Sequence, residues 1–342
     1  MKTTVLISVM VLFSAPLLEG CGDDDDGGDA GVDSGLDAAA DSDTDTDTDS
    51  DTDTDTDTDT DSDTDMDTDS DTDTDSDSDS DMDSGLDSGT MDAGKDTDTD
   101  TVTCTSSVYS GDVNVTSPMD LSALFGHSTL DGNLVIESNS LENLNGLYCL
   151  EMVTGEVSIV HNQLLENVHG LHGLESVGDS LKVWDNDLLI DLDGFLALEK
   201  VSSTLYIDGN DLLADIDGIS NLSTVGWSIS IDGNATLESI DGLCSLKEIP
   251  WNLTIYNNNK LVSLSGLDDV ASILGRLTID SNDSLENLDG LDAVTTLAGD
   301  MSIQNNQSLP HCEADDFRDH LVDAGWTGVA TISGNGDGGV CD

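Results

Sequence analysis

The chain has 342 residues and a formal net charge of −65, because 73 acidic side chains face only eight lysines and arginines. So few basic residues cannot form a basic patch, and we therefore expect no nucleic-acid partner. Large apolar residues are nearly absent between positions 22 and 103 and recur steadily from 104 to 342. Only the second stretch can bury a core.

The first 21 residues have the pattern of an export signal. Lys2 precedes the apolar run Val5–Phe13, which is too short to span a bilayer and has the length of a signal-peptide core. The following Leu17-Leu18-Glu19-Gly20-Cys21 resembles a bacterial lipobox, which implies that Cys21 carries the lipid. The alternative is an ordinary secretory signal with a chance cysteine. We expect a lipoprotein anchored through this lipid, at the outer membrane and cell surface of a Gram-negative bacterium.

Residues 22–103 are of low complexity and should form a disordered acidic stalk. From Asp41 to Asp83 every odd position is Asp, and the even positions are Thr or Ser apart from Met66 and Met82. A period of two could indicate a strand, but pairing would align carboxylates with no apolar face to bury. The stretch resembles the Ser-Asp repeat stalks of bacterial adhesins. Weak binding of divalent cations and glycosylation of the hydroxyls are further possibilities.

From about residue 130 the sequence repeats every 24 residues. An asparagine column marks the period, and we place Asn139 before it with a one-residue deletion; its members are Asn162, Asn186, Asn210, Asn234, Asn258, Asn282 and Asn306. Apolar residues lie three and five positions earlier, as in Ile207 and Leu205. A glycine column follows at Gly146, Gly170, Gly194, Gly218, Gly242, Gly266 and Gly290. A fixed period of this length predicts a repeat fold whose coils share one core.

Each repeat should form one short strand whose two apolar residues face inward, and the strands should stack in parallel. The asparagines would then form a ladder that satisfies backbone groups, and each glycine would allow a tight bend or close packing. The pattern resembles a leucine-rich repeat and, more closely, the receptor L-domain. That resemblance implies a β-rich solenoid, a right-handed single-stranded β-helix, over residues 104–342.

The ends of the array carry the capping signals. A short helix is predicted over 312–324, with Phe317, Leu321 and Val322 on its apolar face, and one more strand should follow near Ile332. We expect disulfides between Cys312 and Cys341 and between Cys104 and Cys149, which leaves Cys244 as a partly buried free thiol.

No pattern in the chain predicts catalysis, so we expect no enzyme, no cofactor and no metal centre. His169 and His172 are three residues apart across a turn, where solvated side chains are more usual than a zinc pair. Four aspartates precede the glycine column at Asp193, Asp217, Asp241 and Asp289. A cation ladder along them is one interpretation; turn residues that cap nearby N–H groups are the other. A hydrolase built from stacked carboxylates is the remotest alternative.

The outward face of the strands offers the clearest candidate site. Trp184, Tyr206 and Tyr256 should project from it beside Lys182, and the chain has only twelve aromatic residues. Exposed aromatics on a rigid sheet suit contact with a protein or a glycan, although they could instead shield the sheet. The sequence thus predicts a surface adhesion or binding protein. The alternative is a structural spacer or acidic coat of the envelope without a specific ligand.

Overall fold

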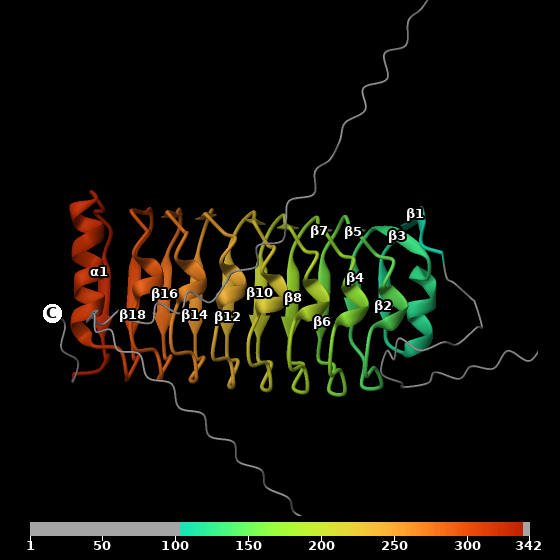
Figure 1. Cartoon of the computed structure of the whole chain (residues 1–342), viewed down its shortest axis with the longest axis horizontal. Helices are drawn as coiled ribbons and strands as arrows, with labels where there is room; N and C mark the ends of the chain where they lie inside the picture. Colours follow the sequence, from blue (N-terminus) through green and yellow to red (C-terminus); the bar gives the residue numbers. More distant parts are fainter. Residues whose placement is uncertain (1–102, 338–342) are drawn as a thin grey trace, which may run out of the picture. The chain divides into compact units, whose positions relative to one another are not determined.

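A computed structural model describes residues 103–337. The predicted lipobox with Cys21, the stalk up to residue 102, and Cys341 lie outside the described residues. Parallel strands in long sheets dominate the described part of the chain, and its one α-helix follows the last repeat (Figure 1). This arrangement is compatible with a β-solenoid, as the 24-residue period predicts.

Each coil contributes one strand to a ten-stranded parallel sheet. Neighbouring strands in this sheet come from consecutive coils of the chain. The strands are β2 (Val113–Val115), β4 (Leu134–Ile136), β6 (Val157–Val160), β8 (Leu181–Trp184), β10 (Leu205–Asp208), β12 (Ile229–Asp232), β14 (Leu253–Tyr256), β16 (Leu277–Asp280), β18 (Met301–Gln304) and β19 (Ala330–Ser333). Equivalent residues are paired from coil to coil; for example, Ile207 lies opposite Val183 on one side and Ile231 on the other. The predicted register therefore holds along the sheet.

A second row of shorter strands, which the sequence analysis did not assign, forms a six-stranded and a three-stranded sheet. The six strands are β1 (Thr105–Ser110), β3 (His127–Asp131), β5 (Met152–Val153), β7 (Ser176–Val177), β9 (Lys200–Val201) and β11 (Thr224–Val225). The other three are β13 (Glu248–Ile249), β15 (Ser272–Ile273) and β17 (Thr296–Leu297). Most of these strands are two residues long, too short to produce an alternating pattern that can be recognised in a sequence.

A column of 3-10 turns completes the coils. It comprises η1 (Pro118–Leu124), η2 (Asn145–Leu147), η3 (His169–Leu171), η4 (Asp193–Phe195), η5 (Asp217–Ile219), η6 (Asp241–Leu243), η7 (Ser265–Leu267) and η8 (Asp289–Leu291). The glycine column lies in these turns, and Gly194 shows why: a Cβ there would approach the Val168 carbonyl oxygen to 1.8 Å. Of the two roles expected for these glycines, close packing between coils is therefore the one they have.

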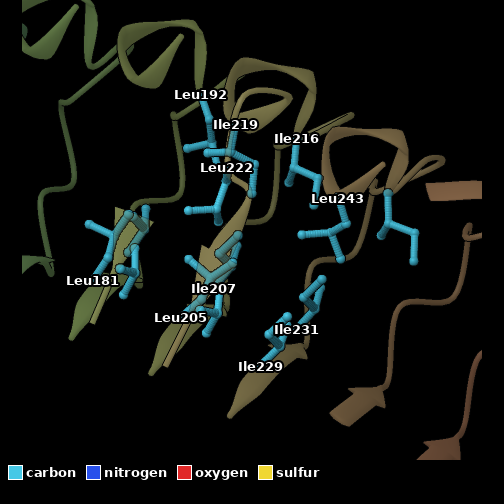
Figure 2. Close-up of a cluster of buried hydrophobic side chains, with 14 of the residues drawn as sticks. Leu181, Leu192, Leu205, Ile207, Ile216, Ile219, Leu222, Ile229, Ile231 and Leu243 are labelled. Carbon is cyan, nitrogen blue, oxygen red and sulfur yellow. The ribbon is translucent and has the colours of Figure 1, made fainter. Parts of the chain in front are cut away.

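The apolar columns fill the space between the strands and the 3-10 turns. Figure 2 shows Leu205 and Ile207 of β10 pointing toward Ile216 and Ile219, which belong to the turn of the same coil. All four side chains are fully buried. No single coil encloses its own apolar residues, so neighbouring coils bury them jointly in one core.

The asparagine ladder is continuous and fully buried. The Asn234 Nδ2 donates to the Ile207 carbonyl at 3.1 Å, and its Oδ1 accepts the Asn210 backbone N–H at 3.1 Å. The same pattern extends to Asn335, whose Oδ1 accepts the Asn306 N–H. The prediction that Asn139 begins the ladder is wrong. Asn139 is exposed, whereas Ser138 is buried and donates its N–H to the Asn162 Oδ1 at 2.8 Å.

The residue before each ladder position has a left-handed backbone. Gly209 and Gly233 have φ of 61° and 66°, and non-glycine residues with φ between 52° and 60° occupy the same place in other coils: His161, Asp185, Asn257, Ser281 and Asn305. Asn, Asp, His and Gly tolerate this region better than most residues. The coil of β4 lacks this position, because only Glu137 separates Ile136 from Ser138. The one-residue deletion expected from the sequence therefore removes the left-handed residue.

The C-terminal cap is the helix α1 (His311–Asp323) followed by β19. Ala314, Phe317 and Leu321 are its buried residues. Val322, which the sequence placed on the apolar face, is instead 50% exposed. The correction follows from helical geometry, because 314, 317 and 321 are spaced at three and four residues and share one face, whereas 322 lies a residue beyond that stripe.

Four cysteines of the described residues are disulfide-bonded, at both ends of the fold and within the stack. Cys104 and Cys149 form a disulfide across 45 residues, with their Cα atoms 5.3 Å apart. Cys244 is disulfide-bonded, so the expectation of a free thiol there is wrong. Cys312 is disulfide-bonded as well. Its expected pairing with Cys341 stays a prediction, since Cys341 lies outside the described residues.

Candidate functional site

The outward face of the ten-stranded sheet carries the predicted site residues. Lys182 lies opposite Tyr206 across the β8–β10 pair, and Trp184 lies opposite Asp208. Each of these side chains alternates along its strand with a fully buried core residue, such as Val183 or Ile207. Alternation along a strand directs them away from the core. The structure therefore brings Lys182, Trp184 and Tyr206 together on two neighbouring strands.

Three rings form a continuous aromatic cluster on this face. The Trp184 and Tyr206 ring centroids are 6.4 Å apart in an edge-to-face arrangement, and the His161 ring centroid is 5.1 Å from Trp184. Trp184 stays 39% exposed, so the cluster presents an accessible ring to solvent. His161 was not among the predicted site residues. The available signal was its position between the last residue of strand β6 and the ladder residue Asn162, next to the outward-facing strand residues.

Carboxylates adjoin the rings. The Tyr206 hydroxyl donates to Asp208 Oδ2 at 2.7 Å, and Asp208 lies in register with Asp232 on the next strand. Burial and, secondarily, the Asp208 charge raise the pKa of Asp232 to about 6. Burial and the hydrogen bond to Asp208 also raise the pKa of the Tyr206 hydroxyl, so it stays protonated as a donor. These two aspartates were not among the predicted site residues.

Tyr256 and Lys182 differ from the expected picture. Tyr256 is 40% exposed but lies on β14, with β12 between it and β10, so its ring stands apart from the Trp184 cluster. Lys182 Nζ lies 2.7 Å from Glu156 Oε2, an ion pair that occupies its charge. The face is therefore an aromatic cluster at one end and a single tyrosine at the other, with Asp208 and Asp232 between them.

A second exposed aromatic feature lies beyond the strand face. Trp227 and Trp251 stack across adjacent coils with ring centroids 4.9 Å apart, 20° between their planes, and exposed fractions of 49% and 43%. Each of them lies two residues before a strand of the ten-stranded sheet, β12 or β14. Their mutual stacking covers one face of each ring, which favours a structural role for the pair.

The two histidines weighed as a metal pair do not face each other. His172 Nδ1 lies 3.0 Å from the backbone carbonyl oxygen of His169, while His169 Nε2 lies 3.8 Å from Asp191 Oδ1.

The aspartates that precede the glycine column also differ in detail from the turn-capping interpretation. The Asp193 N–H is capped by Asp191 Oδ1 at 3.1 Å and the Asp217 N–H by Asp215 Oδ1 at 3.2 Å. The capping oxygen thus comes from two residues earlier.

Comparisons of the chain with protein-family models, with curated proteins and with solved structures gave no match. Within residues 103–337, no helix combines the length and apolar character needed to cross a bilayer.

Proposed function

We propose that this chain is a non-enzymatic binding protein displayed at a bacterial surface, with a protein or a glycan as its ligand. The observation that carries the proposal is the aromatic cluster of His161, Trp184 and Tyr206 on the outward strand face. Aromatic rings contribute large contact areas with few rotatable bonds, which makes them effective anchors at binding surfaces. A stack of coils also presents them on a sheet that needs little ordering on binding.

The ladder behind the face supports this role. Every outward strand residue is attached to a backbone whose neighbours are held by buried asparagine hydrogen bonds, as Asn186 and Asn210 show beside Trp184 and Tyr206. A site on regular strands is positioned more precisely than one on loops. The face should therefore bind with its backbone unchanged.

The remaining parts of the chain extend this proposal. We infer that Cys21 carries a lipid anchor, that residues 22–103 are a spacer, and that the protein resides at the outer membrane of a Gram-negative bacterium. Two or three acyl chains, at roughly 0.8 kcal/mol per buried methylene group, would hold it firmly. The finer fold assignment is likewise a proposal: a right-handed solenoid of the leucine-rich-repeat and receptor L-domain type. The constant 24-residue period and the buried asparagine column support it.

The test compares ring removal on the strand face with ring removal elsewhere. Trp184→Ala combined with Tyr206→Ala should abolish capture of the ligand that the wild-type protein binds on a glycan array or in a pull-down from cell-surface extracts. Trp227→Ala combined with Trp251→Ala is the matched control and should leave it intact. Equal binding by wild-type protein and the Trp184/Tyr206 variant would reject this face. If the wild-type protein captures only the molecules that the acid-rich stalk captures by itself, the result supports an acidic coat without a specific ligand instead.

A further inference from the structure

A histidine and two aspartates from adjacent coils converge beside the 3-10 turns. His169 is the first residue of η3 and Asp193 is the first residue of η4, the equivalent position one coil later. Asp191 lies two residues before Asp193. One ligand atom from each of the three side chains lies within 4.8 Å of the others, and His169 Nε2 is 3.8 Å from Asp191 Oδ1.

The backbone that carries these groups is fixed by packing. A Cβ at Gly170 or at Gly194 would approach a carbonyl oxygen of the preceding coil to 1.8 Å, so both turns are seated directly on their neighbours. Asp191 Oδ1 accepts the Asp193 N–H at 3.1 Å, and Asn167 Oδ1 accepts the His169 N–H at 3.3 Å. Only side-chain rotations separate the three groups from a closer approach.

We propose that His169, Asp191 and Asp193 bind a zinc ion that bridges two coils, through one imidazole nitrogen and two carboxylates. Tetrahedral zinc with bonds of about 2.0–2.2 Å separates its ligand atoms by roughly 3.3–3.6 Å, close to the distance between His169 Nε2 and Asp191 Oδ1. Three protein ligands leave the fourth position to water or to a group of a partner. The imidazole selects zinc over calcium, which takes oxygen ligands in larger number.

The electrostatics of the turn favour a divalent cation. The carboxylates of Asp191 and Asp215 act on Asp193 with charges of the same sign, and His169 is the neighbouring group of opposite effect. A bound dication would offset this repulsion between carboxylates. Neither of the patterns weighed in the sequence analysis would reveal the site, because its ligands combine one member of the His169–His172 pair with the aspartates of the next coil.

The repeat supplies substitutions that remove two of the three ligands and keep the fold. The place of His169 is taken by Asn145 in the preceding coil, so His169→Asn should be tolerated. Asp191→Asn retains the oxygen that caps the Asp193 N–H, as Asn167 does one coil earlier. The matched control is His172→Ser, because Ser220 stands at that place two coils later.

The experiment titrates the full-length, metal-free protein with Co²⁺ and follows the visible absorption, with excess Mg²⁺ present to occupy the stalk carboxylates. Cobalt held octahedrally by carboxylates and water absorbs weakly, whereas a tetrahedral site with an imidazole ligand absorbs strongly. We expect one strongly absorbing equivalent that Zn²⁺ displaces. His169→Asn and Asp191→Asn should each weaken it at least about tenfold, the lower end of what the loss of even a supporting group around a metal ligand costs. His172→Ser should leave it unchanged.

Three results would overturn the proposal. The first is a wild-type titration that yields only the weak octahedral spectrum. The second is a His169→Asn variant that binds as wild type, and the third is a His172→Ser variant that is weakened as much as His169→Asn. Circular dichroism and the unfolding midpoint of each variant confirm that the fold is retained. Because the strand-face residues are untouched, the outcome is independent of the proposed function.

Discussion

The buried asparagine ladder makes the sharpest stability prediction, and Asn234 in the middle of the stack is the residue to change. Its Nδ2 donates to the Ile207 carbonyl, and its Oδ1 accepts the Asn210 N–H. Asn234→Ala removes both partners while the two backbone groups stay buried. The Ile207 carbonyl stays within the paired strands β10 and β12, so the Asn210 N–H is the group left without a partner. A buried group of this kind costs about 1–3 kcal/mol, and the variant should lose about that much unfolding free energy.

Equilibrium urea unfolding followed by tryptophan fluorescence measures this loss, because Trp227 and Trp251 lie in the coil of Asn234 and in the next one. Asn139→Ala is the control: Asn139 is exposed, whereas the buried Ser138 fills the ladder position. Surface substitutions of this kind stay within about 0.5 kcal/mol. A loss at Asn234 no larger than that at Asn139 would refute the claim that the ladder satisfies otherwise unpaired backbone groups.

Three further changes test the packing, the charges and the N-terminal cap. Gly194→Ala should lower the free energy of unfolding in urea by more than about 3 kcal/mol, the upper end of ordinary overpacking. The reason is that its Cβ would meet the Val168 carbonyl oxygen at 1.8 Å. A loss no larger than that of Gly173→Ala, whose Cβ would have its nearest contact at 3.3 Å, would contradict this. The folded pKa of Asp232, raised to about 6 from 3.8, means that the folded state holds the proton more tightly, so stability falls as pH rises from about 4 to 6. Asp232→Asn should therefore gain more melting temperature over wild type at pH 8 than at pH 4, and an equal gain at both would reject the shift. Replacing Cys104 and Cys149 with Ala should cost about 4 kcal/mol, the chain-entropy value for a 45-residue separation, and an unchanged urea midpoint would show that the N-terminal cap does not depend on the bridge.

The repeated parts of the fold could be predicted from the sequence because every coil has the same pattern of apolar residues. Leu205 and Ile207 belong to columns whose members are all apolar, and the structure buries both fully. The second row of strands could not be predicted in the same way. A two-residue strand such as Lys200–Val201 offers one inward residue and no alternation, and its hydrogen bonds depend on the neighbouring coils rather than on local sequence.

The candidate sites were predictable only in part, because they are built across coils. The sequence identified Trp184 and Tyr206 as outward residues, but their contact with His161 depends on how neighbouring coils stack. Asn139 was misplaced for a related reason. A deletion of one residue shifts every later position, and the sequence does not say whether it removes the ladder residue or the left-handed residue before it. Burial of Ser138 decides this in favour of the second.

Recognition by a repeat fold must therefore depend on the positions at which a coil departs from its neighbours. Where every coil carries the same residue at one position, the surface is the same along the whole stack. Such a surface offers a ligand no preferred place to bind. Trp184 stands where the adjacent coils carry Val160 and Asp208, and His169 stands where they carry Asn145 and Asp193. The two departures lie in neighbouring coils, His169 in the turn η3 that follows β6 and Trp184 on β8 of the next coil. If the chain binds specific ligands, these two coils are where single substitutions should change binding while the surrounding coils remain folded.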